Sequence, residues 1–312
     1  MQTETVVLKN FRLNVFKNLM EQSLMVTNQL MINLNKDIMK ACSYSSTNTF
    51  IKLWAINLNN LIIKPDTDGI IDFDNTIKDE ELKFPEFDFY ILRGDLFKKF
   101  LTVFNFDTVD IEFTLELINN KYQATSLIVS GEGTDQTMLK TTFSLTTEEL
   151  ISNKIDDYSG IIKELTPSKK CFEFILSSKQ IQEIKRLIKN LHKSNSNNSA
   201  YLTFTVDSEN KKIIVNDKVF VLNIILSNEL QNELKFPEES FNFNILKSDF
   251  IMTGNHDFTF YVNSEETKII LGARYMSALI WGLTTKIEIS NININEAALD
   301  ASIDALNIEE YM

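Results

Sequence analysis

Apolar residues alternate with polar ones along much of the chain, which is the pattern of strands that bury one face. The alternation is clearest at residues 87–91, 109–115, 202–206, 241–245 and 258–262. Only a few segments show the three-to-four-residue apolar spacing of a helix. The pattern therefore predicts an α+β chain that is rich in strands and sparse in helices.

One local pattern occurs more than once. The segment from Phe87 to Phe97 aligns without gaps with the segment from Phe241 to Ile251, with Phe, Phe, Ile, Leu and Asp at matching positions. A weaker copy begins at Phe172, and the segment from Thr5 to Leu19 is a candidate for a degenerate fourth helix. Each copy predicts a strand, a short polar turn and an amphipathic helix. Four copies indicate two duplicated units in each of two domains, although chance similarity between Phe-rich strands is the alternative.

A domain boundary is expected in the stretch of mixed polarity that runs from residue 146 to residue 170. The expected division is a first domain at residues 1–148, a connector at 149–170, a second domain at 171–290 and a C-terminal extension at 291–312. The extension has the composition of a helix, with Leu299, Ile303 and Leu306 on one side. It is either an acidic docking tail or a helix that is frayed or packed on its own domain.

The helix predicted after Ser177 and Ser178 has two contrasting faces. On a helical wheel, an apolar arc lies opposite a basic arc, and residues 178–193 hold a single acidic residue, Glu183. The apolar arc consists of Ile181, Ile184, Leu187, Ile188 and Leu191. The basic arc consists of Lys179, Lys185, Arg186, Lys189, His192 and Lys193. One face is suited to a core and the other to an anion, but a solvated basic face on an ordinary amphipathic helix has the same pattern.

The other predicted helical units are also basic. Lys98 and Lys99 lie opposite the apolar side of the second unit, and Lys247 takes the place of Arg93 in the fourth. The N-terminal segment adds Lys9, Arg12 and Lys17. Basic helices in an otherwise acidic chain suggest one shared surface that meets a polyanion. Lysines on helix surfaces contact phosphates without reading bases.

Composition supports a globular chain and gives no sign of catalysis. The 312 residues include 31 Lys and Arg against 43 Asp and Glu, a formal charge of −12, with 23 Phe and only 8 Gly. No glycine-rich phosphate loop, metal-binding Cys/His motif or nucleophile elbow occurs, so we expect neither an enzyme nor a cofactor or metal site. The two cysteines, the N-terminus and the absence of a long apolar run predict a protein of a reducing compartment, with no membrane contact.

Taken together, these patterns resemble the DNA polymerase sliding clamps, and within them the T-even bacteriophage type, in the superfamily that includes proliferating cell nuclear antigen. The resemblance is carried by residues 241–284, which look like the closing strand, short helix and β-meander of the phage clamp's second domain. Residues 87–113 resemble the equivalent part of the first domain. The chain is longer than a typical phage clamp around residues 33–79 and after residue 290.

The resemblance implies a head-to-tail homotrimeric ring that encircles duplex DNA and tethers a polymerase. Helices would line the hole, strands would form the outside, and subunits would join through edge strands, with residues 110–117 as one expected edge. Further implied partners are an ATP-dependent clamp loader and short peptides, which would bind a pocket near the connector, for which Leu150, Ile151, Ile155 and Tyr158 are candidates. The protein would act in the cytoplasm, that of a bacterial host if phage-encoded.

Two other classes fit the same patterns. One is a monomeric clamp-fold processivity factor that holds DNA by charge alone. The other is a β-rich structural or virion-assembly protein whose basic helix binds another protein. An unrecognised hydrolase is a third and weaker interpretation.

Overall fold

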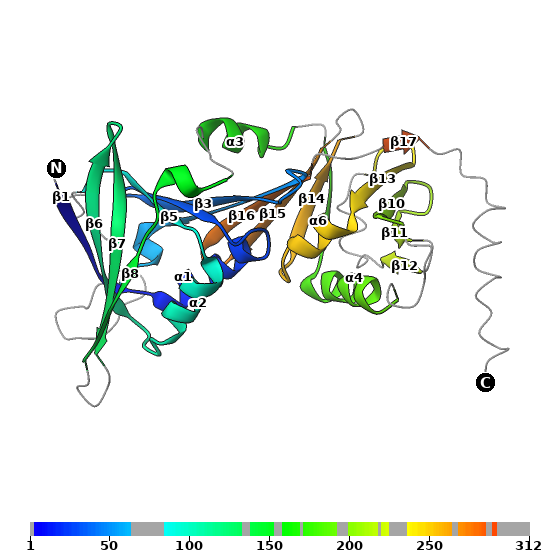
Figure 1. Cartoon of the computed structure of the whole chain (residues 1–312). Helices are drawn as coiled ribbons and strands as arrows, with labels where there is room; N and C mark the ends of the chain where they lie inside the picture. Colours follow the sequence, from blue (N-terminus) through cyan, green and yellow to red (C-terminus); the bar gives the residue numbers. More distant parts are fainter. Residues whose placement is uncertain are drawn as a thin grey trace.

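The computed structural model describes residues 3–63, 84–132, 138–152, 158–168, 171–191, 199–217, 220–224, 236–263, 268–284 and 289–291. Their strands form a twelve-stranded sheet and a five-stranded sheet (Figure 1). Alternation of apolar and polar residues accounts for most of the strands, because these strands bury one face. The prediction of a strand-rich α+β chain is confirmed.

The first half of the chain contains two strand–helix units, each followed by further strands. In order, its elements are β1 (Thr3–Phe11), α1 (Leu13–Leu24), β2 (Leu30–Leu34), β3 (Ile38–Tyr44), β4 (Phe50–Asn57), η1 (Leu58–Asn60), β5 (Phe87–Ile91), α2 (Gly94–Thr102), β6 (Val109–Ile118), β7 (Lys121–Glu132) and β8 (Met138–Ser144). The connector follows with η2 (Glu148–Leu150) and α3 (Tyr158–Glu164).

The second half repeats this order. Its elements are β9 (Phe172–Leu176), α4 (Ser178–Leu191), β10 (Tyr201–Asp207), β11 (Lys212–Asn216), β12 (Val221–Ile224), β13 (Phe241–Leu246), α6 (Lys247–Met252), β14 (Phe258–Val262), β15 (Ile269–Tyr275), β16 (Ala278–Thr284) and β17 (Ile289–Asn291). Strands followed by helices at β1, β5, β9 and β13 match the four copies expected from the sequence.

Strand pairing repeats along with element order. The first half contains the runs β1-β6-β7 with β8 beside β7, and β5-β2-β3-β4; the second contains β9-β14-β15-β16 and β13-β10-β11-β12. In this comparison β4 corresponds to β12, and β16 corresponds to β8. The two halves are therefore two copies of one arrangement, each made of two four-strand runs.

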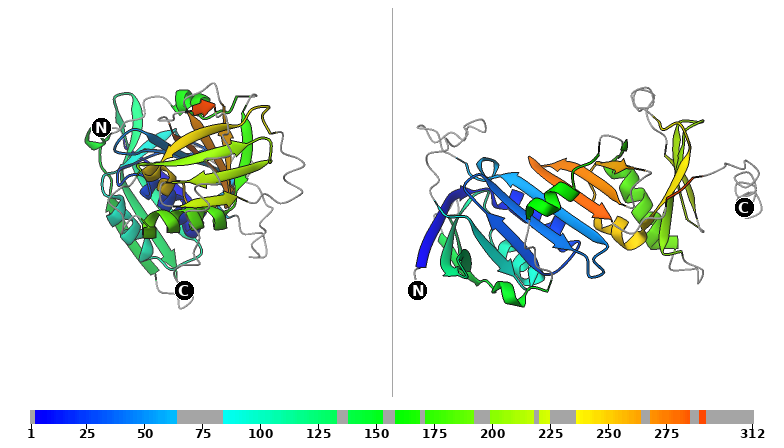
Figure 2. Two further views of the ribbon diagram at one scale, coloured as in Figure 1. Left: turned by 90° about the vertical axis from the view of Figure 1, so that its right-hand side faces the viewer. Right: turned by 90° about the horizontal axis from the view of Figure 1, so that it is seen from above.

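The halves are joined by main-chain pairing. β4 pairs with β16 in antiparallel register, from Phe50 opposite Thr284 to Ile56 opposite Ala278, so the large sheet is continuous across both halves. On one face of the sheets lie α1, α2, α4 and α6, which share the main core through Phe16, Phe97, Ile184 and Phe250. Helix α3 lies on the opposite face, over the middle of the large sheet (Figures 1 and 2).

Two expectations from the sequence are wrong in detail. The segment from Thr5 to Leu19 is not one helix, because the alternation of Val6 and Leu8 belongs to β1 and the helix begins at Leu13. Residues 110–117 are not a free edge, because β6 pairs with β1 on one side and with β7 on the other. Edge and central strands share the same alternation, so the sequence does not distinguish them.

A buried lysine lies beside the join between the halves. Lys52, on β4, is 1% exposed, and its Nζ donates to Gln22 Oε1 on α1 at 3.0 Å and to the Met252 carbonyl at the end of α6 at 2.9 Å. Gln22 Nε2 in turn lies 2.8 Å from His256 Nε2. Burial, with a smaller contribution from Lys185, holds the pKa of Lys52 well below its usual value. One side chain thus bridges helices from both halves.

This burial makes a prediction about pH. The folded chain binds a proton at Lys52 less readily than the unfolded chain, so the folded state gains stability as pH rises from the folded pKa to about 10.4. Between pH 7 and 10, the free energy of unfolding of wild type should therefore rise relative to that of Lys52→Met, by up to about 1.4 kcal/mol per pH unit. Urea unfolding at several pH values measures the difference.

The Lys179→Met variant, which removes an exposed ammonium from α4, is the matched control. A constant difference between wild type and Lys52→Met would show that the buried amine does not titrate as described.

Candidate nucleic-acid interface and partner groove

Helix α4 begins where the sequence predicts, at a reciprocal cap. The Gln180 backbone N–H donates to Ser177 Oγ at 3.3 Å, and the Ser177 backbone N–H donates to Gln180 Oε1 at 2.8 Å. Asp257 Oδ1 accepts from the Ser178 N–H at 2.6 Å, which satisfies another free donor of the first turn. These contacts fix where the basic residues of α4 fall relative to the core.

The two faces of α4 are those expected from the wheel. Ile181, Ile184 and Ile188 are buried in the main core, with Leu187 packed against it. Lys179, Arg186 and Lys189 are exposed on the other side. Between Ser178 and Leu191 there are four Lys or Arg residues and one Glu, so α4 presents net positive charge on the helix-bearing side. His192 and Lys193 lie outside the described residues.

Two of the basic residues of α4 have partners within the chain. Lys185 is half-buried, and its Nζ donates to the Gly254 carbonyl and to Asn255 Oδ1, the latter at 3.2 Å. Burial lowers the pKa of Lys185 to about 8. Arg186 pairs with Glu183 one turn earlier. Lys185 therefore contributes to the fold as well as to the charge of this surface.

Basic residues on α1 and α2 join these helices to each other. Lys17 Nζ donates to the Phe104 carbonyl just after α2 at 2.6 Å, and Lys98 Nζ lies 2.7 Å from Glu21 Oε1 on α1. Lys99 is exposed on α2. Burial lowers the pKa of Lys17. This half of the helix-bearing side is consequently less basic than α4.

The remaining candidates are placed differently. Lys9 is exposed on β1 and shares the face of Val7, away from the buried Val6 and Leu8. Arg12 precedes α1 and is partly buried. Lys247 is 8% exposed, and its Nζ lies 2.7 Å from Asp217 Oδ2 and donates to the Ser199 carbonyl. The burial of Lys247 conflicts with a DNA-facing role, which its place in the repeat suggested.

The strand face opposite the helices carries acidic residues. On β6, Asp110, Glu112 and Glu116 alternate with buried apolar residues and are only partly buried, and Glu173 is exposed in the same way on β9. Exposed cations cluster on α4 and carboxylates cluster on the outward face of β6, a face that Lys9 of neighbouring β1 shares. A polyanion would be attracted to α4 and repelled by the carboxylates of β6.

Comparisons with known proteins give one kind of match. No family model matches the chain, and no curated protein matches it in sequence. Among solved structures, it is similar to the proliferating cellular nuclear antigen of Entamoeba histolytica, with a TM-score of 0.59 and 10% sequence identity. The match covers 90% of this chain and 97% of that one. The chain has the clamp fold.

A metal centre and a membrane-spanning helix are not found in the described residues. These residues contain no cluster of three or more His, Cys, Asp or Glu residues that could hold a metal ion. No described helix is long and apolar enough to cross a bilayer. The arrangement can offer phosphates a row of ammonium groups, and such contacts position a nucleic acid without reading its sequence.

The connector candidates fall on the opposite side of the sheet. Ile151 is buried, Tyr158 is partly buried on α3, and Leu150 is exposed. Burial, with smaller contributions from neighbouring Cys42 and Asp88, raises the pKa of Tyr158 well above its usual value. Ile155 lies outside the described residues. Two of the four connector candidates therefore pack onto the sheet.

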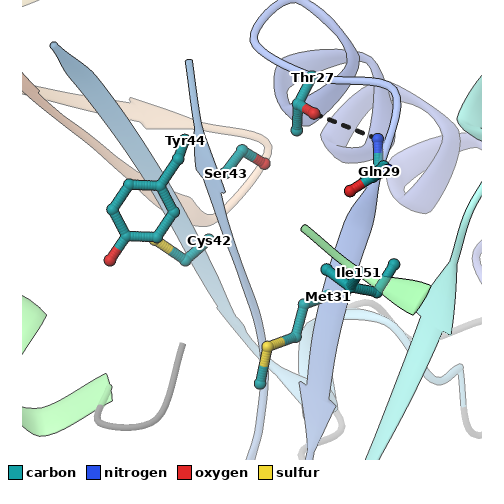
Figure 3. A pocket seen from close by; sticks show the side chains of 7 residues that line it. All are labelled: Thr27, Gln29, Met31, Cys42, Ser43, Tyr44 and Ile151. Atoms are coloured by element: carbon teal, nitrogen blue, oxygen red, sulfur yellow. Dashed lines mark hydrogen bonds between the residues drawn. The ribbon is translucent and has the colours of Figure 1, made fainter. Parts of the chain in front are cut away.

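A small pocket lies beside the connector. Ile151 closes one side of it, and side chains in the loop between α1 and β2, on β2 and on β3 close the rest, as Figure 3 shows. The lining residues are Thr27, Gln29, Met31, Cys42, Ser43, Tyr44 and Ile151. Gln29 Oε1 also accepts from the Ser152 N–H at 2.8 Å, which ties the start of the connector to this pocket.

Sequence reasoning missed the apolar residues under the connector. Met31, Cys42, Ile51 and Leu53 form a second buried cluster with Ile270 on the face opposite the main core. The sequence signal was the nearly continuous apolar run of β2 and of β4, a pattern typical of strands covered on both faces.

The ion pair of Lys247 generates a prediction. Removing the ammonium leaves Asp217 buried without this partner, so Lys247→Met should lower the free energy of unfolding by about 3–5 kcal/mol. Lys189→Met, at an exposed position on α4, should change it by no more than about 0.5 kcal/mol. Urea unfolding of the two variants tests this, and equal stabilities would show that Lys247 is not a structural residue.

Proposed function

We propose that this protein is a DNA polymerase processivity factor, a sliding clamp that surrounds duplex DNA and holds a polymerase near it without catalysis. The observation that carries the proposal is the exposed basic arc of α4 on the helix-bearing side of a clamp fold, with carboxylates on the outward face of β6. A polyanion inside a ring of such subunits would be attracted to α4 and repelled by the carboxylates of β6.

The proposed DNA-facing residues follow from exposure. Lys99, Lys179, Arg186 and Lys189 are exposed on α2 and α4, and Lys17, Lys98 and Lys185 add charge while bound to partners in the chain. His192 and Lys193 extend the basic arc of α4 in sequence. We leave Lys9 and Lys247 out of the set because one lies on the strand face and the other is buried.

Ring closure is supported by the internal repeat. Within one chain, β4 of the first half pairs with β16 of the second half. The strand that corresponds to β4 in the second half is β12, and the strand that corresponds to β16 in the first half is β8. In the described residues, β8 pairs only with β7 and β12 only with β11, and the two strands lie at opposite ends of the molecule (Figure 1). They are too far apart to pair within one copy. Pairing of β8 with β12 of a second copy would repeat the internal join and give a head-to-tail assembly.

The finer features of the proposal rest on the resemblance seen in the sequence. We propose a homotrimer of the T-even bacteriophage type, with domains at residues 1–148 and 171–290 joined by a connector at 149–170. Its partners would be double-stranded DNA, a DNA polymerase and an ATP-dependent clamp loader, in the cytoplasm of a bacterial host. Partner peptides would bind the outer face near Ile151 and Tyr158, where the connector packs on the sheet.

Reversing charge on α4 tests the DNA contact. Lys179→Glu combined with Lys189→Glu should weaken binding to a labelled duplex at low salt by about tenfold or more, and should flatten its salt dependence, because fewer counterions are released. Stability should change by less than about 1 kcal/mol, since both side chains are exposed. Fluorescence anisotropy across a salt series measures both quantities.

The matched control is Lys36→Glu combined with Lys163→Glu, which makes the same change in net charge at exposed residues away from α1, α2, α4 and α6. If both pairs weaken binding equally, net charge alone governs the interaction and α4 is not the DNA-facing surface.

Blocking the two edges separately tests head-to-tail assembly. Met138→Glu with Thr142→Glu places charge on exposed positions of β8, and Val221→Glu with Asn223→Glu does so on β12. Each variant alone should be monomeric in sedimentation, because every junction would contain one blocked strand. Their mixture should form dimers and nothing larger, because one junction per pair then has two intact edges.

The alternatives predict other outcomes. Wild type that is monomeric at micromolar concentration would favour a clamp-fold factor that holds DNA by charge alone. Wild type that is retained equally on circular and linear DNA would contradict encirclement. Assembly with no affinity for DNA would favour the structural or virion-assembly role.

A further inference from the structure

The outer face of the large sheet carries an apolar surface that spans both halves of the molecule, which we call the groove and define by the following residues. Met31, Cys42, Ile51 and Leu53 come from β2, β3 and β4, and Ile270 and Leu283 come from β15 and β16. Aromatic side chains that remain partly exposed pack around these residues: Tyr44, Tyr158, Tyr261 and Trp281. This cluster lies across the β4–β16 join and is separate from the main core.

A segment of the chain itself occupies the groove. Helix α3 lies over the middle of the sheet in two views (Figures 1 and 2), and Ile161 and Leu165, one turn apart, are buried in the cluster. Ile162, next to Ile161, is 47% exposed and faces away. The groove therefore accepts aliphatic side chains at i and i+4 of a short helix.

Helix α3 is held by its docking and not by its own stability. It has seven residues with Gly160 among them, and helices of this length are marginal in water without tertiary contacts. Its polar ties are made by side chains: Tyr158 OH donates to the Met31 carbonyl at 3.5 Å, and Lys268 Nζ donates to the Glu164 carbonyl at 3.3 Å. The Lys40 ammonium lies 4.7 Å from the Tyr158 ring centroid.

We propose that α3 is an internal competitor that closes the partner groove, and that partner peptides bind by displacing it. This inference rests on the proposed function for the existence of such partners, and it adds how their access is regulated. The partner chemistry follows from what α3 inserts: a short amphipathic peptide with aliphatic or aromatic side chains one turn apart. The pocket beside Ile151 is the part of the groove that α3 leaves open.

Closure of this kind has a measurable consequence. A tethered segment competes at high effective concentration, so the apparent affinity of an external peptide is reduced by the fraction of molecules in which the groove is open. Weakening the docking of α3 should therefore strengthen peptide binding, although no contact with the peptide has been added.

The test uses a fluorescent synthetic peptide of residues 158–166 as the probe. Ile161→Asp combined with Leu165→Asp should undock α3, and the variant should bind the probe at least about tenfold more tightly than wild type. Ile162→Asp is the matched control, with the same substitution on the exposed side of α3, and should bind as weakly as wild type. A scrambled peptide should bind none of the three proteins.

Trp281 gives a second readout, because it packs against the groove cluster while Trp54, the other tryptophan, is fully buried. Acrylamide quenching of tryptophan emission should increase in the Asp variant and stay unchanged in Ile162→Asp. If the Asp variant does not fold, Ile161→Ala with Leu165→Ala makes the same comparison with a smaller expected gain.

Equal probe affinity and equal quenching in wild type and the undocked variant would overturn the proposal. The assay contains neither DNA nor polymerase, so its outcome is independent of the proposed clamp function. A monomeric protein without DNA affinity could still show the competition, and a working clamp could lack it.

Discussion

The antiparallel pairing of β4 with β16 is the contact on which the rest of the structure depends. Its register places Phe50 and Trp54 on the helix-bearing side and Ile51 and Leu53 on the outer side. A shift of one residue would exchange these faces. Lys52 would then lose its hydrogen bonds to α1 and α6, and the groove would lose the apolar side chains of Ile51 and Leu53.

Close packing on the helix-bearing side leaves little room for error at this join. Gly282 lies opposite Lys52 in the pairing, and a Cβ added to it would lie 3.1 Å from Phe50 Cζ. The buried amine of Lys52 lies here and donates to groups from both halves. A buried polar group is a costly way to gain stability but a specific way to fix geometry, because it must find its acceptors. In the proposed ring, the angle between the halves would determine whether the ring closes.

The regular parts of this fold could be predicted from the sequence. Alternation located β5, β6, β10, β13 and β14, and the echo between residues 87–97 and 241–251 located two of the four strand–helix units. The faces of α4 followed from its period because its core side is purely aliphatic and its cap lies within three residues of its start. These are local signals, and each depends on residues close together in the chain.

The failures involve contacts that are distant in sequence. Lys247 looked like a surface cation by its place in the repeat, and only the fold brings it to Asp217. The pattern of β6 gave no sign that β1, a hundred residues earlier, covers its edge. The groove under α3 combines strands from both halves, so no window of the sequence contains it.

The helix-bearing face contains two kinds of lysine, those with partners within the chain and those that are exposed, and the net charge does not distinguish them. Lys17, Lys98 and Lys185 each contact a carbonyl or carboxylate of the chain, so part of their attraction for an anion is already satisfied. Lys99, Lys179 and Lys189 remain exposed. In the proposed ring, attraction must be strong enough to centre the duplex and too weak to hold one phosphate. A few exposed lysines, beside cations that already have partners in the fold, fit this proposal.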